Sequence, residues 1–145
     1  MKTKRVVGGW AVVLVSFACG TEPAADVSGQ WDYSESIENA GGSIACDGVG
    51  DLLLDLAGGS TRVTGQRAQT VTCTGAPAGF DGVVGGVHTL ANGELSGSGI
   101  SFEANLCEYE GTLNAAADQL SGTVSCAFPV QGQPETFTGT WAATR

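Results

Sequence analysis

The chain has 145 residues, of which 15 are acidic and only six are basic, for a formal net charge of −9 at pH 7. From Cys19 onward the only basic residues are Arg62, Arg67 and Arg145, so that the side chains there sum to −12. Such a surface repels nucleic-acid phosphates and anionic lipid head groups, which argues against nucleic-acid binding and against electrostatic docking to a membrane.

The first 18 residues have the order of a secretory signal peptide. A short basic start is followed by an uncharged, largely apolar run over residues 6–18. This run is too short to span a bilayer and is typical of a signal-peptide core. We therefore expect residues 1–18 to be a signal peptide, and the protein to be exported.

Cys19 is the predicted lipidation site. It follows Ala18 within a segment that resembles a bacterial lipobox, although Ser16 and Phe17 depart from that pattern. Residues 19–26 would then form the lipid-anchor tether, holding the protein in the bacterial cell envelope at the outer membrane or the periplasmic face. The alternative is ordinary cleavage near Ala24 or Ala25 and secretion.

The cysteine count supports the same compartment. Five cysteines are present, and an exported protein with an odd number should have one otherwise employed. Lipid on Cys19 leaves four, enough for two disulfides in an oxidising compartment. No CxxC spacing occurs, so we expect no metal site.

The rest of the chain predicts an all-β domain over residues 27–145. Period-two alternation recurs between turn-forming clusters, and no long stretch has helical periodicity. The expected strands are Val27–Tyr33, Asp51–Ala57, Thr61–Gln66, Gln69–Thr74, Phe80–Leu90, Glu94–Glu103, Leu106–Leu113, Leu120–Phe128 and Glu135–Ala143. This spacing favours a monomeric antiparallel meander that closes into an up-and-down β-barrel of about eight or nine strands. A β-sandwich is the alternative.

The hairpin near the C-terminus can be aligned by its two faces. Setting Leu113 opposite Leu120 places Cys107 opposite Cys126 and leaves the other face polar throughout. Opposed residues on neighbouring strands lie close enough for a disulfide, so the register predicts Cys107–Cys126. The second disulfide, Cys46–Cys73, follows by elimination.

The same counting around Gly59-Ser60 brings Cys46 level with Cys73, although residues 66–69 look like a second turn that would interrupt this register. Asn92-Gly93 predicts a further two-residue hairpin. That hairpin would set Leu90 opposite Leu95 and give a core face of Val83, Val87, Ile100 and Phe102, with His88 on the outer face.

The two ends of the domain echo each other in Gly29-Gln30-Trp31 and Gly139-Thr140-Trp141. A Gly-x-Trp on the first strand, a meander with tight hairpins and a basic residue near the end resemble the lipocalin and avidin group of β-barrels, and small lipocalin-like lipoproteins of bacteria in particular. The resemblance covers nearly all of the mature chain. It implies that Trp31 plugs one barrel end, that Arg145 lies across it, and that the barrel holds a small ligand.

Catalytic residues are scarce. The single histidine, His88, has no assignable nucleophile, and Ser43 lacks the strand-to-helix setting of a nucleophile elbow. Glu108 and Glu110 have polar neighbours and suit a solvated strand face. Asp47, Asp51 and Asp55 lack the glycine and glutamate of a calcium loop. We therefore expect no enzyme activity and no cofactor.

Two hypotheses about function remain. In the first, the barrel binds a small apolar or amphipathic ligand near Trp31, Phe102, Tyr109 and Trp141. In the second, the same aromatic residues fill the barrel, and the protein is a structural or interaction protein of the envelope. The resemblance favours the first.

Overall fold

The computed structural model describes residues 25–145. The predicted signal peptide, Cys19 and most of the tether lie outside the described residues. The described part is all-β, with one short helix, α1 (Phe80–Val84). The strands are β1 (Gly29–Asn39), β2 (Ala45–Leu56), β3 (Arg62–Thr74), β4 (Gly86–Thr89), β5 (Ala91–Ser96), β6 (Gly99–Ala104), β7 (Cys107–Leu113), β8 (Gln119–Val130) and β9 (Gln133–Thr144).

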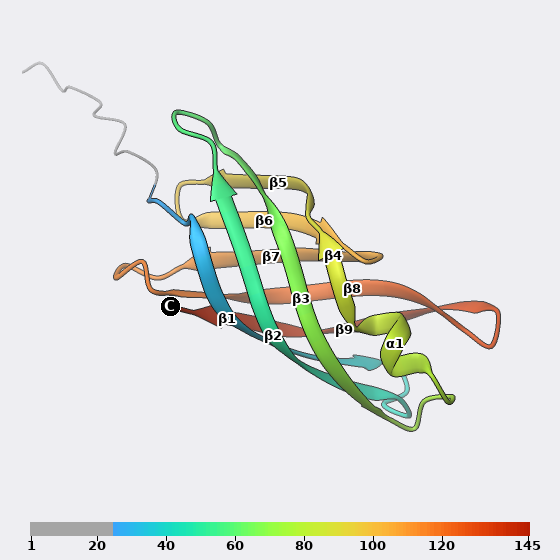
Figure 1. Cartoon of the computed structure of the whole chain (residues 1–145). Coiled ribbons are helices and arrows are strands. Elements are labelled where there is room, and N and C mark those ends of the chain that lie inside the picture. The colour runs from blue at the N-terminus through green and yellow to red at the C-terminus, as the bar shows by residue number, and fades with distance from the viewer. Residues whose placement is uncertain (1–24) are drawn as a thin grey trace, which may run out of the picture.

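Eight of the strands close into an antiparallel barrel, which confirms the predicted fold class (Figure 1). The first strand pairs with the last, β1 with β9, and β3 reaches across to β5. Within the described part of the chain, the ninth strand, β4, pairs only with β3. Within residues 25–145 no helix is long and apolar enough to cross a bilayer.

The barrel interior is the hydrophobic core. Strand side chains alternate in and out, so that every second residue of β1, from Trp31 to Asn39, is buried. At one end the Arg145 guanidinium lies 4.3 Å from the centre of the Trp31 ring, and Trp31 Nε1 donates to the Val27 carbonyl over 2.9 Å. At the other end α1 covers the barrel and packs Phe80 against Phe128 and Phe137.

Both predicted disulfides are present. Cys107 opposes Cys126 in the register set by Leu113 and Leu120, and Cys46 opposes Cys73. The disulfides join neighbouring strands near the end of the barrel that α1 covers. They are compatible with an exported protein.

Several local predictions are wrong, among them the single strand Glu94–Glu103, which divides into β5 and β6. Residues 66–69 are not a turn, because β3 runs unbroken from Arg62 to Thr74 and carries Arg67 into the barrel. Asn92-Gly93 is not a hairpin turn either: it lies at an irregularity within β5, and the reversal to β6 is at Gly97-Ser98. Leu95 therefore opposes Ile100 rather than Leu90.

The predicted strand Phe80–Leu90 is also wrong, because it divides into α1 and β4. Val83 and Val87 are 41% and 66% exposed, whereas Ile100 and Phe102 are buried as predicted. His88 lies opposite the buried Arg67 and is half-buried, not on an outer face. Its Nε2 is 3.0 Å from the Gly85 carbonyl oxygen.

Candidate functional site

The four predicted ligand residues are all in the barrel interior, and the structure brings three of them together. Trp31, Phe102, Tyr109 and Trp141 are each at most 2% exposed. Phe102 stacks on Tyr109 with ring centres 4.7 Å apart, and Trp141 meets Phe102 edge-on at 5.4 Å. Trp31 is apart from them, beneath Arg145 at the barrel end.

A polar cluster lies beside these rings and is the most unusual feature of the interior. It consists of Glu35, Arg67, Gln69 and the hydroxyls of Tyr33 and Tyr109, and we call it the buried polar cluster. Arg67 is fully buried and the other four residues are at most 7% exposed. Such groups are rarely buried in a small core unless they are paired.

Glu35 is the acceptor at the centre of the cluster. Its Oε2 accepts from the Tyr33 hydroxyl over 2.6 Å and from the Tyr109 hydroxyl over 2.9 Å. Its Oε1 accepts from Gln69 Nε2, also over 2.9 Å. Arg67 Nη1 lies 3.3 Å from Glu35 Oε2 and also donates to the Tyr109 hydroxyl. One buried carboxylate thus has a cation and three neutral donors.

The strands place these side chains by simple alternation. Glu35 is in phase with Trp31 and Tyr33 on β1, and Arg67 and Gln69 share the inward face of β3. Gly48 on β2, opposite Glu35, leaves the space that the Gln69 amide occupies. A Cβ at position 48 would lie 2.5 Å from Gln69 Oε1.

Within the cluster, burial governs the ionisation of Tyr33. It raises the pKa of Tyr33 well above the usual value, since the phenolate would be desolvated, and the Glu35 charge raises it further. Tyr33 is therefore a neutral donor at physiological pH. Two buried polar atoms of the cluster, Arg67 Nε and Gln69 Oε1, have no hydrogen-bond partner within residues 25–145.

The end of α1 closes the cluster from the side. The Val84 carbonyl accepts from Gln69 Nε2 over 3.3 Å and faces Arg67 Nη2 at 3.5 Å. The same carbonyl accepts from Asn105 Nδ2 over 3.0 Å, and Asn105 also donates to the Val83 carbonyl over 2.9 Å. Asn105 belongs to the turn between β6 and β7, so this one carbonyl joins the cluster to the barrel wall.

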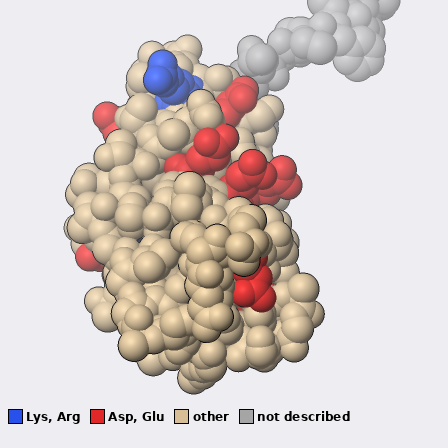
Figure 2. Space-filling view, turned by 90° about the vertical axis from the view of Figure 1, so that its right-hand side faces the viewer, with Lys and Arg blue, Asp and Glu red and all other residues tan. Residues whose placement is uncertain are grey.

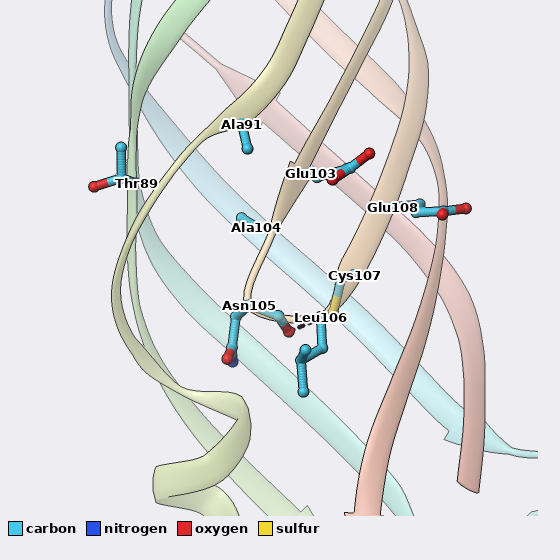
Figure 3. Close-up of a pocket in the computed structure, with 8 residues that line it drawn as sticks. All are labelled: Thr89, Ala91, Glu103, Ala104, Asn105, Leu106, Cys107 and Glu108. Carbon is cyan, nitrogen blue, oxygen red and sulfur yellow. Dashed lines mark hydrogen bonds between the residues drawn. The ribbon is translucent and has the colours of Figure 1, made fainter. Parts of the chain in front are cut away.

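The wall beside Asn105 is hollowed. A surface hollow of about 370 Å³ lies where β4 and β5 diverge from β6 (Figure 3). In Figure 3, Thr89 and Ala91 lie on one side of the hollow, and Ala104, Asn105 and Leu106 on the other. Glu103 and Glu108 form its outer rim. On the face shown in Figure 2, acidic side chains gather in the upper half, whereas the lower half is largely uncharged.

Comparisons with known proteins add nothing to this geometry: no family model matches the chain, and neither does any curated protein. The site therefore has to be interpreted from its own chemistry.

The weaker candidates from the sequence are not assembled. Ser43 Oγ accepts from Asn39 Nδ2, and His88 faces the Gly85 carbonyl, so the two have separate partners. Glu108 and Glu110 lie on the exposed face of β7, opposite Ser125 and Thr123. Among residues 25–145, no group of three or more His, Cys, Asp or Glu is arranged to hold a metal ion.

Sequence reasoning missed Glu35, Arg67 and Gln69. The expected first strand ended at Tyr33, one step short of Glu35, although Glu35 and Ile37 continue its period-two pattern. Residues 66–69 look like a turn, which separates Arg67 from the predicted strand that begins at Gln69. A continuous strand through them would have placed both in phase with Val63 and Val71 on the inward face.

Proposed function

We propose that this protein is a lipocalin-like lipoprotein of the bacterial cell envelope that binds a small amphipathic ligand in its barrel. One observation carries the proposal: a buried ion pair in an aromatic interior is flanked by two unpartnered polar atoms, Arg67 Nε and Gln69 Oε1. Ligand sites are commonly apolar spaces with a few convergent polar groups, and unsatisfied buried polar atoms are rare elsewhere.

The energetics support a binding role over a structural one. A buried ion pair seldom stabilises a fold more than well-packed apolar residues of the same volume. Leaving a donor and an acceptor unpaired costs about 1–3 kcal/mol for each. A cluster kept at such a cost is better explained by a ligand that completes its hydrogen bonds.

The unpartnered atoms define the polar end of that ligand. Arg67 Nε is a donor and Gln69 Oε1 is an acceptor, so the ligand should present both an acceptor and a donor, as a hydroxyl or a protonated carboxyl group does. An apolar remainder would pack against Phe102 and Trp141, as the sequence-based hypothesis expects. Within the lipocalin-like proposal, Trp31 and Arg145 close the barrel end and do not touch the ligand.

The lipid anchor belongs to the same proposal. The two disulfides, the basic and apolar N-terminus and the cysteine at position 19 support export followed by lipidation of Cys19. The first described residues lie at the Arg145 end, since Arg145 Nη2 donates to the Asp26 carbonyl. The tether would therefore leave the barrel at the end opposite α1.

A second candidate function has its own observation. The interior aromatic side chains stack closely on one another and are almost completely buried, as in a filled barrel. In that case the buried polar cluster fixes the register of β1 and β3, and the protein acts in the envelope through its surface.

Intact mass of the protein recovered from its own envelope, under native and then denaturing conditions, separates the two candidates. We expect a native species with a small added mass that disappears on denaturation. The denatured chain should then show lipid on Cys19 and the loss of four hydrogens through two disulfides. A bare native mass would contradict ligand binding and favour the filled barrel.

Variants then test whether the cluster is the site. Gln69→Leu removes the unpartnered acceptor, and we expect it to weaken ligand affinity about tenfold, the effect of 1.4 kcal/mol, and so to lower occupancy when ligand is limiting. The matched control is Gln119→Leu, at an exposed position of β8. If ligand occupancy is the same in both variants, the ligand does not bind at the cluster.

A further inference from the structure

The β4 strand lies outside the closed eight-stranded barrel, and one of its edges is unpaired within residues 25–145. The β3–β4 ladder runs from Gly86 opposite Gln69 to Thr89 opposite Gln66. Within residues 25–145 no strand pairs with the other side of β4. Leu90 N donates to the Gly65 carbonyl. Because hydrogen-bonded and non-hydrogen-bonded pairs alternate along an antiparallel ladder, this bond shows which β4 residues direct their backbone groups towards β3. The backbone N–H and C=O groups of Val87 and Thr89 accordingly point away from β3, and Thr89 also lines the hollow.

This edge is short, with four residues, but it lacks the other features that usually prevent pairing with another chain. Exposed edges are commonly blocked by proline, by charged side chains or by a covering element. The strand Gly86–Thr89 has no proline and no charged residue, and Val87 is 66% exposed. A further strand can therefore add here through backbone hydrogen bonds.

The apolar surface beside the edge is equally unusual. Leu106 is 66% exposed at the tip of the β6–β7 turn and has a φ of 62°. A bulky residue rarely adopts this left-handed conformation, and the second position of such a turn favours glycine. Glycine would therefore suit the turn at this position better than leucine does. The leucine side chain instead gives the hollow an apolar wall.

We propose that the β4 edge and the adjoining hollow bind an extended, basic segment of a partner polypeptide by strand addition. The charge at the rim indicates a basic partner. Glu103 and Glu108 lie directly opposite each other on β6 and β7, an unfavourable like-charge pair that a lysine or arginine of the partner would neutralise. An apolar side chain of the same segment would occupy the hollow against Leu106. This interaction does not depend on the interior ligand.

A second copy of this chain fits the edge less well. It would bring another Glu103–Glu108 pair and another strongly acidic surface to the same place, because the residues from Cys19 onward carry 15 acidic and three basic side chains. Like charges brought together at an interface weaken it. Strand addition by a basic segment relieves the repulsion that a dimer would increase.

Hydrogen exchange on the full chain tests the proposal. The probe is a synthetic peptide of alternating lysine and valine, with an alternating glutamate and valine peptide and a lysine–valine peptide interrupted by proline as controls. We expect the basic peptide to slow exchange of the Val87 and Thr89 amides at least about tenfold, the effect of 1.4 kcal/mol. The two control peptides should leave these amides unchanged.

Matched variants locate the binding surface. Val87→Ala and Leu106→Gly should each weaken peptide binding about tenfold. Val49→Ala, at a residue 63% exposed on β2, should not. Leu106→Gly also removes the backbone strain of a leucine at positive φ, so this variant should be at least as stable as the parent. Weaker peptide binding by this variant could therefore not be explained by unfolding. Glu103→Gln and Glu108→Gln should lower the affinity and reduce its dependence on salt.

Several results would overturn the proposal. Equal protection by the acidic peptide, or no protection at Val87 and Thr89, would exclude strand addition by a basic segment. Equal weakening by Val49→Ala would show that the peptide binds elsewhere on the barrel. Concentration-dependent self-association in sedimentation that Val87→Ala abolishes would assign the edge to a second copy of this chain.

Discussion

Replacing Arg67 by methionine should destabilise the barrel strongly, because it leaves a buried carboxylate without its cation. The Arg67 side chain is fully buried and that of Glu35 is 1% exposed, with 3.3 Å between Nη1 and Oε2. Breaking such a pair costs about 3–5 kcal/mol. Glu35 keeps three neutral donors in the variant, so we expect the lower end of this range, about 3 kcal/mol.

The second variant, Glu35→Gln with Arg67→Met, removes both charges and should recover most of that loss. A glutamine at position 35 can still accept from the tyrosine hydroxyls, and methionine fills much of the arginine volume. Each single variant should lose about 3 kcal/mol, and the double variant should lie within about 1 kcal/mol of the parent. Urea unfolding at pH 7, followed by tryptophan fluorescence and extrapolated linearly, measures all four proteins.

The reasoning fails if Arg67→Met costs under about 1 kcal/mol, because the pair would then be solvated rather than buried. It also fails if the losses of the two single variants simply add in the double variant, since a direct pair must show coupling. A melting temperature lowered by roughly 12 °C, at about 4 °C per kcal/mol for a domain of this size, would agree with the expected loss.

Three further predictions concern stability. The pKa of Tyr33 is raised in the folded state, so the unfolded chain releases this proton first as the pH rises through about 10. The free energy of unfolding should therefore fall above that pH, and it should fall less steeply in Tyr33→Phe. Urea titrations from pH 8 to 11 would show this difference. Replacing Cys46 and Cys73 by serine opens a crosslink of sequence separation 27 and should cost about 3.5 kcal/mol by loop entropy relative to the oxidised parent, as urea unfolding would show. Gly111→Ala places a Cβ 2.6 Å from Trp141 Cζ2 and should cost about 1–3 kcal/mol, whereas Gly58→Ala meets no atom within 4 Å and should cost little.

The fold was predictable where two independent patterns agreed. In the β7–β8 hairpin, the polar outer face and the paired cysteines require the same register, because a slip of one residue would reverse both faces. The Cys107–Cys126 disulfide follows from that agreement, and Cys46–Cys73 then follows by elimination. The Asn92-Gly93 turn had only a dipeptide in its favour, and the chain reverses instead at Gly97-Ser98.

The buried polar cluster was not predictable by the same means, because binary patterning assigns Glu35, Arg67 and Gln69 to the outside or to loops. Their burial is tolerated only because the charges meet across the barrel, between strands β1 and β3 that do not pair with each other. This compensation is tertiary. Sequence alone could show that Glu35 continues the inward phase of Trp31 and Tyr33, but not that Arg67 would face it.

The contacts of Asn105 lead to a last prediction, about how firmly α1 covers the cluster. Asn105 Nδ2 donates to the Val83 and Val84 carbonyls, and its φ of 48° suits glycine as well as asparagine. Asn105→Gly thus removes two hydrogen bonds without straining the turn. At about 0.5–1.5 kcal/mol for each bond, α1 should open at least about fivefold more often. Exchange of the Gly85 amide, which donates to the Asp81 carbonyl, would report this, with the Gly122 amide of β8 as the control. Unchanged exchange at Gly85 would mean that the burial of Phe80 and Val84 holds the helix in place and that the link through Asn105 does not.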